Sequence, residues 1–340
     1  MKKNVFNCSL LAALTLIAFS SCDNDDDNDS GINTIKSSQL YVSNNSDGNI
    51  TVLDILSGEI KTLTTTSTAA EGIYYDAAID EVIQASRSSN QLNVYSDIST
   101  FLASATISAT VSSASDLQSP RDIAVYNDIV VVSDNSDVDG DTTTPDGRLF
   151  VYTKTNGTLT LRNIVITDFA LWGIEFVNGD LYAVVDKTNE LAVYTNFTTM
   201  NTTNAAVSAS KRIAIEGIVR THGLAYDNGT MILTDVGDAA SNSDGAFHII
   251  SDFENKFDTV NNGDTMAVAN NQVRVAGSNT LLGNPVAAEY DAITKTVFIA
   301  EAANGGGRVL SFSNSTIGGD LSPTINTSLA SASSLYFYAN

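Results

Sequence analysis

A short apolar and aromatic motif that recurs along this 340-residue chain constrains its fold more than any other feature. Each copy starts with a small or polar residue and continues into a run of β-branched or aromatic residues. The six copies are Gly72–Asp76, Asp122–Tyr126, Gly173–Val177, Gly223–Asp227, Ala287–Asp291 and Ser334–Tyr338. They follow one another at intervals of about 50 residues, with one longer interval, which is typical of the four-stranded blades of a β-propeller.

The sequence between the copies also favours an all-β fold. From Ser38 onward, short β-branched runs alternate with Asn, Asp, Gly and Ser, and helical periodicity is almost absent. Asn178-Gly179 and Asn228-Gly229 directly follow two of the copies, and Asn-Gly is the strongest short hairpin signal. We therefore predict a six-bladed β-propeller in which each motif is a first strand, joined by a tight turn to a second strand.

The two ends of the chain predict how the ring of blades closes. Ser334–Asn340 has the pattern of a first strand that stops at its turn, whereas Ser38–Ser43 has the pattern of a second strand with no first strand before it. Joined end to end, they match the first and second strands predicted for residues 224–234. We predict that both termini build the first blade of a propeller domain spanning residues 38–340, which would leave no exposed sheet edge.

Residues 1–21 have the pattern of a processing signal. Lys2 and Lys3 precede a largely apolar stretch that is too short for a confident membrane-spanning helix, and small residues then precede Cys22. Cys8 falls within the removed segment, so Cys22 would be the only cysteine of the mature chain. No intramolecular disulfide is then expected, and stability must come from packing.

The sequence Phe19-Ser20-Ser21-Cys22 resembles a bacterial lipoprotein signal, which implies cleavage before Cys22 and acylation of its thiol. Residues 22–37 would form a tether, because Asp23–Gly31 carries dense negative charge and no apolar side chain. This run resembles the acidic export tag of surface lipoproteins of the Bacteroidetes. The resemblance implies an outer-membrane lipoprotein exposed at the cell surface. The alternatives are an ordinary secretory signal and a spacer that leaves the domain facing the periplasm.

The net charge of −22 limits the classes of partner. A field of this sign repels phosphate backbones, which argues against nucleic-acid binding. We expect a monomer that contacts the membrane through the lipid on Cys22 and binds an unidentified small molecule or protein.

Residues 184–194 contain a strand, Asp186, a turn with Asn189 and a second strand. This pattern resembles the signature of NHL-repeat propellers, and residues 38–340 as a whole resemble NHL-repeat and related six-bladed propellers. Such proteins serve as lactonases, lyases, hydrolases and binding discs, so the resemblance implies a fold and leaves the function open.

In a propeller, the starts of the first strands and the ends of the second strands share one face around the central channel. The candidate ligand-binding residues of this face are Arg87, Arg121, Trp172, Asp186, His222, Asp235 and Glu301. A polar ring with one aromatic residue suits a small-ligand site. The alternative is that these polar residues only cap the loops at the strand ends.

Glu71 resembles the early metal-binding Glu of gluconolactonase-type propellers, which implies a metal-dependent hydrolase with Glu71 and His222 as candidate catalytic residues. The chain departs from that family because Trp172 and His222 stand where Asn ligands are expected. With only His222 and His248, a three-histidine zinc site is excluded. We therefore predict a binding disc first, a hydrolase of the lactonase class second and a structural envelope component third.

Residues 135–146 match a twelve-residue calcium loop, with Gly140 at the sharp turn. The expected ligand residues are Asn135, Asp137, Asp139, Asp141 and Asp146. The loop departs from the usual pattern because Asn replaces Asp at the first position and Asp replaces Glu at the twelfth. No flanking helices are predicted. We expect Ca²⁺ to stabilise this loop, the alternative being an Asp-rich turn without a cation.

Overall fold

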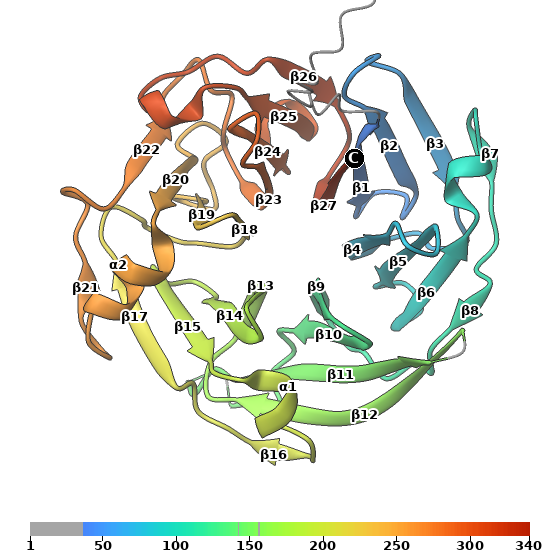
Figure 1. Cartoon of the computed structure of the whole chain (residues 1–340), viewed down its shortest axis with the longest axis horizontal. Helices are drawn as coiled ribbons and strands as arrows, with labels where there is room; N and C mark the ends of the chain where they lie inside the picture. Colours follow the sequence, from blue (N-terminus) through green and yellow to red (C-terminus); the bar gives the residue numbers. More distant parts are fainter. Residues whose placement is uncertain (1–36, 142, 156) are drawn as a thin grey trace, which may run out of the picture. The chain divides into compact units, whose positions relative to one another are not determined.

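The computed structural model describes residues 37–141, 143–155 and 157–340. In this part of the chain, six mainly antiparallel sheets surround a central channel as the blades of a propeller (Figure 1). The prediction of an all-β, six-bladed β-propeller is confirmed. The predicted signal peptide, Cys22 and the tether up to residue 36 lie outside the described residues.

Each blade starts with its innermost strand at the channel and continues outward. The first blade contains β27 (Ala332–Ala339), β1 (Ser38–Asn44), β2 (Ile50–Asp54), β3 (Ile60–Thr64) and β7 (Ala105–Thr106). The second contains β4 (Ala70–Asp76), β5 (Glu81–Ser86), β6 (Gln91–Ser96) and β8 (Val111–Ser112). The third contains β9 (Pro120–Tyr126), β10 (Ile129–Asp134), β11 (Gly147–Thr155), β12 (Thr158–Thr167) and β16 (Ala205–Ala206).

The remaining three blades follow the same plan. The fourth contains β13 (Leu171–Val177), β14 (Asp180–Val185), β15 (Glu190–Tyr194), β17 (Lys211–Ile215) and β21 (Thr265–Met266). The fifth contains β18 (Leu224–Asp227), β19 (Thr230–Asp235), β20 (Ala246–Ser251) and β22 (Val273–Ala276). The sixth contains β23 (Pro285–Asp291), β24 (Thr296–Glu301), β25 (Arg308–Phe312) and β26 (Ile325–Ser328).

The six motif copies form the innermost strands, as predicted. Neighbouring innermost strands approach closely: a Cβ atom on Gly223 would lie 2.6 Å from the Cα of Ala287, so the residue directly before β18 must be a glycine. The turn after β13 has φ of 52° at Asn178 and 92° at Gly179. Positive φ at both central residues defines a type I′ turn, which explains why Asn-Gly stands there.

The first blade closes through both ends of the chain. Strand β1 pairs antiparallel with β27, with Ser38 opposite Ala339 and Leu40 opposite Phe337. The backbone N–H of Asn340 donates a hydrogen bond to the carbonyl oxygen of Ser37 at 3.0 Å. The predicted closure of the ring is therefore confirmed.

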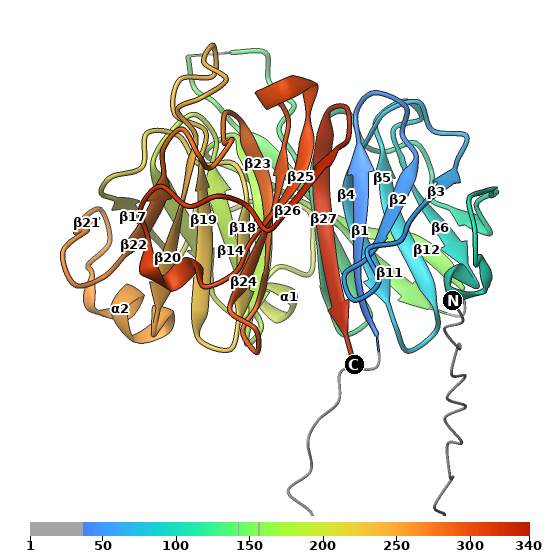
Figure 2. The same ribbon diagram turned by 90° about the horizontal axis from the view of Figure 1, so that it is seen from above.

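The ring has two distinct faces (Figure 2). The second strands end at one of them, where loops lead back to the next first strand; we call it the channel-mouth face. Ser37 and Asn340 lie at the opposite face. The short helices α1 (Phe197–Met200) and α2 (Phe253–Thr259) also follow strands that end there. None of the helices in the described ranges is long and apolar enough to cross a membrane.

The apolar core lies mainly between neighbouring blades. One cluster joins the third and fourth blades through Val151, Leu171 and Tyr194, and equivalent clusters join the other neighbours. Three two-residue strands add to this connection, because β7, β16 and β21 each pair in parallel with the outer strand of the preceding blade. The packing holds the innermost strands, and with them the channel, in a fixed arrangement.

Candidate functional site

Glu71 lies on β4 at the channel-mouth face and is only 4% exposed. Its Oε2 accepts a hydrogen bond from Nη1 of Arg121 at 2.9 Å, and its Oε1 accepts one from Nη1 of Arg87 at 3.2 Å. The side-chain amide of Asn45 also donates to Oε1. Both carboxylate oxygens are therefore engaged by protein donors, with the two positive charges offsetting the cost of burying the carboxylate.

Three flat side chains from consecutive blades stack on the same face. The guanidinium carbon of Arg121 on β9 lies 4.1 Å from the centroid of the Trp172 ring on β13. The rings of Trp172 and His222 are 3.8 Å apart and inclined by 3°. We call Arg121, Trp172 and His222 the rim stack. It combines a cation–π contact with parallel ring stacking.

Two donors of the rim stack are buried without a hydrogen-bond partner among the described residues: Nε of Arg121 and Nδ1 of His222. Folded proteins rarely leave buried polar atoms unpaired, because each costs about 1–3 kcal/mol. These two N–H groups of the rim stack therefore lack an acceptor within the described part of the protein.

His222 is held by Asp186 and Arg220. Nε of Arg220 donates to Nε2 of His222 at 2.9 Å, and Nη2 of Arg220 lies 3.2 Å from Oδ1 of Asp186. Burial, followed by the charge of Arg220, lowers the pKa of His222, so the ring is neutral at pH 7. A guanidinium can only donate, which makes Nε2 the acceptor and leaves the proton on Nδ1.

Asp186 differs from the other acids at the second-strand ends. Burial would raise the pKa of Asp186, but the positive charge of Arg220, whose Nη2 lies against its Oδ1, outweighs burial and lowers it. In contrast, Asp235 accepts the backbone N–H groups of Val219 and Arg220, each at 3.0 Å. Sequence reasoning missed Arg220, which lies in the loop before β18 and carries no motif.

Glu301 repeats the arrangement of Asp235. Its carboxylate accepts four backbone N–H groups, from Gly283, Asn284, Ala303 and Asn304. Asp235 and Glu301 therefore both hold loops through backbone N–H groups. The second carboxylate oxygen of Asp235, Oδ2, has no hydrogen-bond partner among the described residues and lies 3.9 Å from Nη2 of Arg274. Of the residues predicted for the ligand site, the structure brings five together around the rim stack: Arg87, Arg121, Trp172, Asp186 and His222.

A cavity of about 240 Å³ lies inside the channel, between the innermost strands. Its lining includes three acids that the sequence analysis did not single out, namely Asp122, Glu175 and Glu289. Two of these acids stand out in the sequence, because Glu175 and Glu289 occupy the third position of their motif copies, where the other copies have Tyr or Ala.

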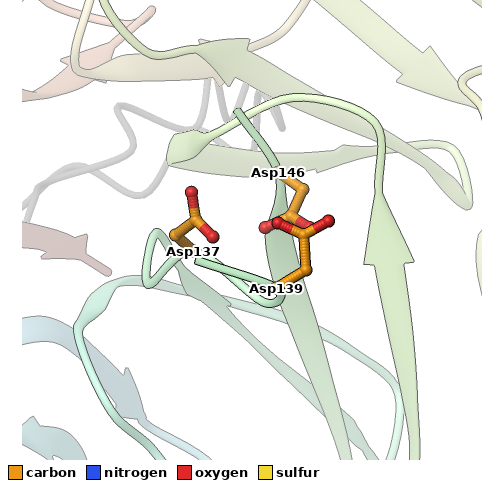
Figure 3. Close-up of side chains that lie close together, drawn as sticks. All are labelled: Asp137, Asp139 and Asp146. Carbon is orange, nitrogen blue, oxygen red and sulfur yellow. The ribbon is translucent and has the colours of Figure 1, made fainter. Parts of the chain in front are cut away.

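The predicted calcium loop joins β10 to β11 on the channel-mouth face. Carboxylate oxygens of Asp137, Asp139 and Asp146 lie within 4.8 Å of one another, and Figure 3 shows the three side chains around one loop. The carboxylate of Asp141 instead accepts the backbone N–H of Thr143 at 3.0 Å, and in such loops this position typically offers its backbone carbonyl. The structure therefore gathers three of the five predicted ligand residues into one oxygen-rich group, the type of donor that Ca²⁺ prefers.

Comparison with known proteins identifies the fold. No protein-family model matches the sequence, and no curated protein matches it. A chain in the crystal structure of the nidogen/laminin complex is similar to this chain with a TM-score of 0.57 at 13% identity. The match covers 88% of this chain and 98% of the other. At this identity the similarity shows the six-bladed β-propeller fold alone.

Proposed function

We propose that this chain is a binding protein of the bacterial cell envelope that holds an anionic small molecule, or an acidic segment of a partner protein, on its channel-mouth face. The observation that carries the proposal is the pair of unpartnered buried donors in the rim stack, on Arg121 and His222. An acceptor from a ligand would satisfy them, and such charge-assisted hydrogen bonds are stronger than neutral ones.

The positive charges of this face support an anionic ligand. The side chains of Arg87, Arg121 and Arg220 are 32%, 14% and 21% exposed, so their guanidinium groups remain within reach of a bound molecule. Two of them share the single carboxylate of Glu71, which leaves one positive charge in excess beside Trp172. On a chain with a net charge of −22, such a local excess directs an anion to this position.

The contacts of Glu71 favour binding over the hydrolase alternative. A metal-binding carboxylate needs free lone pairs, and those of Glu71 are directed at Arg87, Arg121 and Asn45. His222 is likewise held by Arg220 through the nitrogen that would act as a base.

The single tryptophan of the chain makes the proposal directly testable. Trp172 fluorescence should change when citrate, benzoate or a poly-glutamate peptide is titrated into the protein, and Arg121→Gln should weaken the response at least tenfold. Exposed Lys295, on the opposite face, provides the control variant Lys295→Gln. Absence of any response to all three anions, or an unchanged response in Arg121→Gln, would overturn the proposal.

We further propose that the chain is a lipoprotein anchored through Cys22 and displayed at the cell surface. The signal-like residues before Cys22 and the acidic run after it support this address. Cys22→Ala should abolish labelling by fatty acid and release the protein from the membrane fraction, with Cys8→Ala as control. Protease treatment of intact cells then distinguishes surface display from a periplasmic position. Equal membrane retention of Cys22→Ala would contradict the anchor.

The oxygen-rich group of Asp137, Asp139 and Asp146 supports a proposal that Ca²⁺ stabilises the loop of residues 135–146. Extracellular modules with such loops bind calcium at about 10⁻⁴–10⁻³ M, which suits an exported protein.

A further inference from the structure

The channel cavity is a second polar site, separate from the rim stack. Asp122 enters it from the third blade, Glu175 from the fourth and Glu289 from the sixth. Two tyrosines, Tyr74 and Tyr336, also line it, with ring centroids 4.8 Å apart. At about 240 Å³ the cavity is smaller than the usual site for a drug-sized molecule, so an occupant would have only a few heavy atoms.

The charge inside the cavity is not balanced by the protein. Among the described residues, none of the three acids forms an ion pair. Asp122 accepts the backbone N–H groups of Ile123 at 2.9 Å and Ile174 at 3.0 Å. Backbone N–H groups also lie near the other two carboxylates, that of Phe176 near Glu175 and those of Tyr290 and Phe337 near Glu289. The nearest guanidinium groups, those of Arg87 and Arg121, are committed to Glu71.

Burial first, and then mutual repulsion, disfavours ionisation of these acids. The pKa of Asp122 is raised to about 7, with Glu71 adding to the effect, and that of Glu175 to about 8, with Asp122 adding. The pKa of Glu289 is raised well above its ordinary value by burial, Glu175 and Asp122. The tyrosines facing them carry no positive charge that could reverse this.

Ser334 adds a hydroxyl to the lining of the cavity. This residue is only 2% exposed and lies on β27, the strand that also carries Tyr336. A hydroxyl can both donate and accept, so it can form a hydrogen bond with an occupant of the cavity.

The spacing of the acids argues for an organic cation rather than one bare metal ion. Across the described ranges, only Asp137, Asp139 and Asp146 bring three carboxylate oxygens within 4.8 Å of one another. The channel acids are therefore too dispersed to coordinate a single ion together. A cation with N–H donors on two atoms can reach separated carboxylates, and its carbon chain can contact the tyrosine rings.

We propose that the channel cavity binds a small organic diamine in its protonated form, between Asp122, Glu175 and Glu289. Ionised carboxylates hold the two ammonium groups, and Ser334 supplies a hydrogen bond. Because the acids must lose protons before they can pair with the ligand, binding at neutral pH releases protons and tightens as the pH rises.

The test is calorimetric titration of the full chain with 1,4-diaminobutane, using 1,4-butanediol as an uncharged ligand of the same length. We expect binding of the diamine only, an affinity that rises about tenfold per pH unit between pH 6 and 7 for each proton released, and heats that depend on the buffer. Glu175→Gln and Glu289→Gln should each weaken binding at least tenfold. Exposed Glu59→Gln should leave it unchanged.

Several results would overturn the proposal: no binding at millimolar diamine, equal binding of the diol, or unaltered affinity in both Gln variants. Tighter binding of calcium that the Gln variants abolish would replace the diamine with a metal ion. If either Gln variant fails to fold, Ser334→Ala gives a milder change with an expected severalfold loss. Trp172→Ala should not affect diamine binding, so this site and the rim stack succeed or fail separately.

Discussion

At the scale of single residues, the acids at the ends of the second strands make different contacts in different blades. Asp235 and Glu301 each end a second strand and hold a loop through backbone N–H groups. Asp186 directly follows the corresponding strand of the fourth blade, but its carboxylate faces Arg220 and His222. The acid at the end of the second strand therefore holds a loop in the fifth and sixth blades. In the fourth blade, the acid at this position pairs with the charged residues beside the rim stack.

Glu71 is the residue on which the charges of the rim depend. Replacing it in Glu71→Gln removes the counter-charge of Arg87 and Arg121 while keeping the shape of the side chain. We expect the free energy of unfolding to fall by roughly 2–4 kcal/mol, because a partly buried guanidinium pair is left uncompensated. Urea unfolding measures this loss, with Glu59→Gln on the exposed surface as control. Unchanged stability would show that the pairing contributes nothing.

The channel acids predict an unusual pH dependence without any ligand. Their folded-state pKa values lie above the unfolded ones, so their contribution to stability is complete below about pH 4.5 and is lost as the pH rises through about 8. Glu175→Gln should therefore reduce the loss of stability between pH 5 and pH 8 by roughly 1–3 kcal/mol. Urea unfolding at both pH values checks this, and identical pH dependence in wild type and variant would contradict it.

The sequence predicted the rim better than the channel. Arg121, Trp172 and His222 could be predicted because each immediately precedes a motif copy, and the topology of a propeller places such residues together. Glu175 and Glu289 could not be assigned to a site from the sequence, because the pattern of a strand does not show that its acid faces a closed cavity. Which residues each side chain contacts depends on blade packing, so the loop-holding roles of Asp235 and Glu301 needed the structure.

At the scale of strands and loops, the turns followed from local chemistry. The Asn-Gly pairs adopt positive φ at both positions, as the sequence predicts. The parallel strands β7, β16 and β21 were not foreseen, because two-residue strands have no periodicity and their partners belong to the preceding blade. The helices α1 and α2 were likewise too short to leave a helical pattern.

The loop of residues 135–146 carries the calcium prediction. Without a cation, its three clustered carboxylates repel one another, and bound calcium would offset that repulsion. Wild-type protein should gain roughly 1–3 kcal/mol of stability when calcium exceeds its dissociation constant ten- to hundredfold. Asp137→Ala/Asp139→Ala should lose this gain, whereas Glu59→Ala should keep it. Thermal unfolding with calcium and with chelator tests this prediction. If the melting temperature does not shift at millimolar calcium, the loop is an Asp-rich turn that binds no cation.

At the scale of the whole molecule, closure of the ring joins residues that are almost a full chain apart. Strand β27 belongs to the first blade through β1, but it also packs against its neighbours: the rings of Phe337 and Phe298 on β24 stack at 4.8 Å. Tyr338 meets Tyr75 on β4 with centroids 5.4 Å apart. The C-terminal strand therefore links the sixth, first and second blades.

Deleting residues 334–340 should consequently prevent stable folding of the entire ring. Removing a buried leucine or phenylalanine costs about 2–5 kcal/mol, and the deletion removes several such contacts from a domain whose total stability is of order 5–15 kcal/mol. It would also expose the edge of β1, the strand with which β27 pairs, to aggregation. Single substitutions give a graded comparison. Leu335 is 4% exposed, so Leu335→Ala should lower the free energy of unfolding by about 2–4 kcal/mol. Leu102 is 91% exposed, so Leu102→Ala should change it by less than about 0.5 kcal/mol. A truncated protein with the wild-type melting temperature would mean that the ring is stable without β27 and that closure is not what holds the blades together.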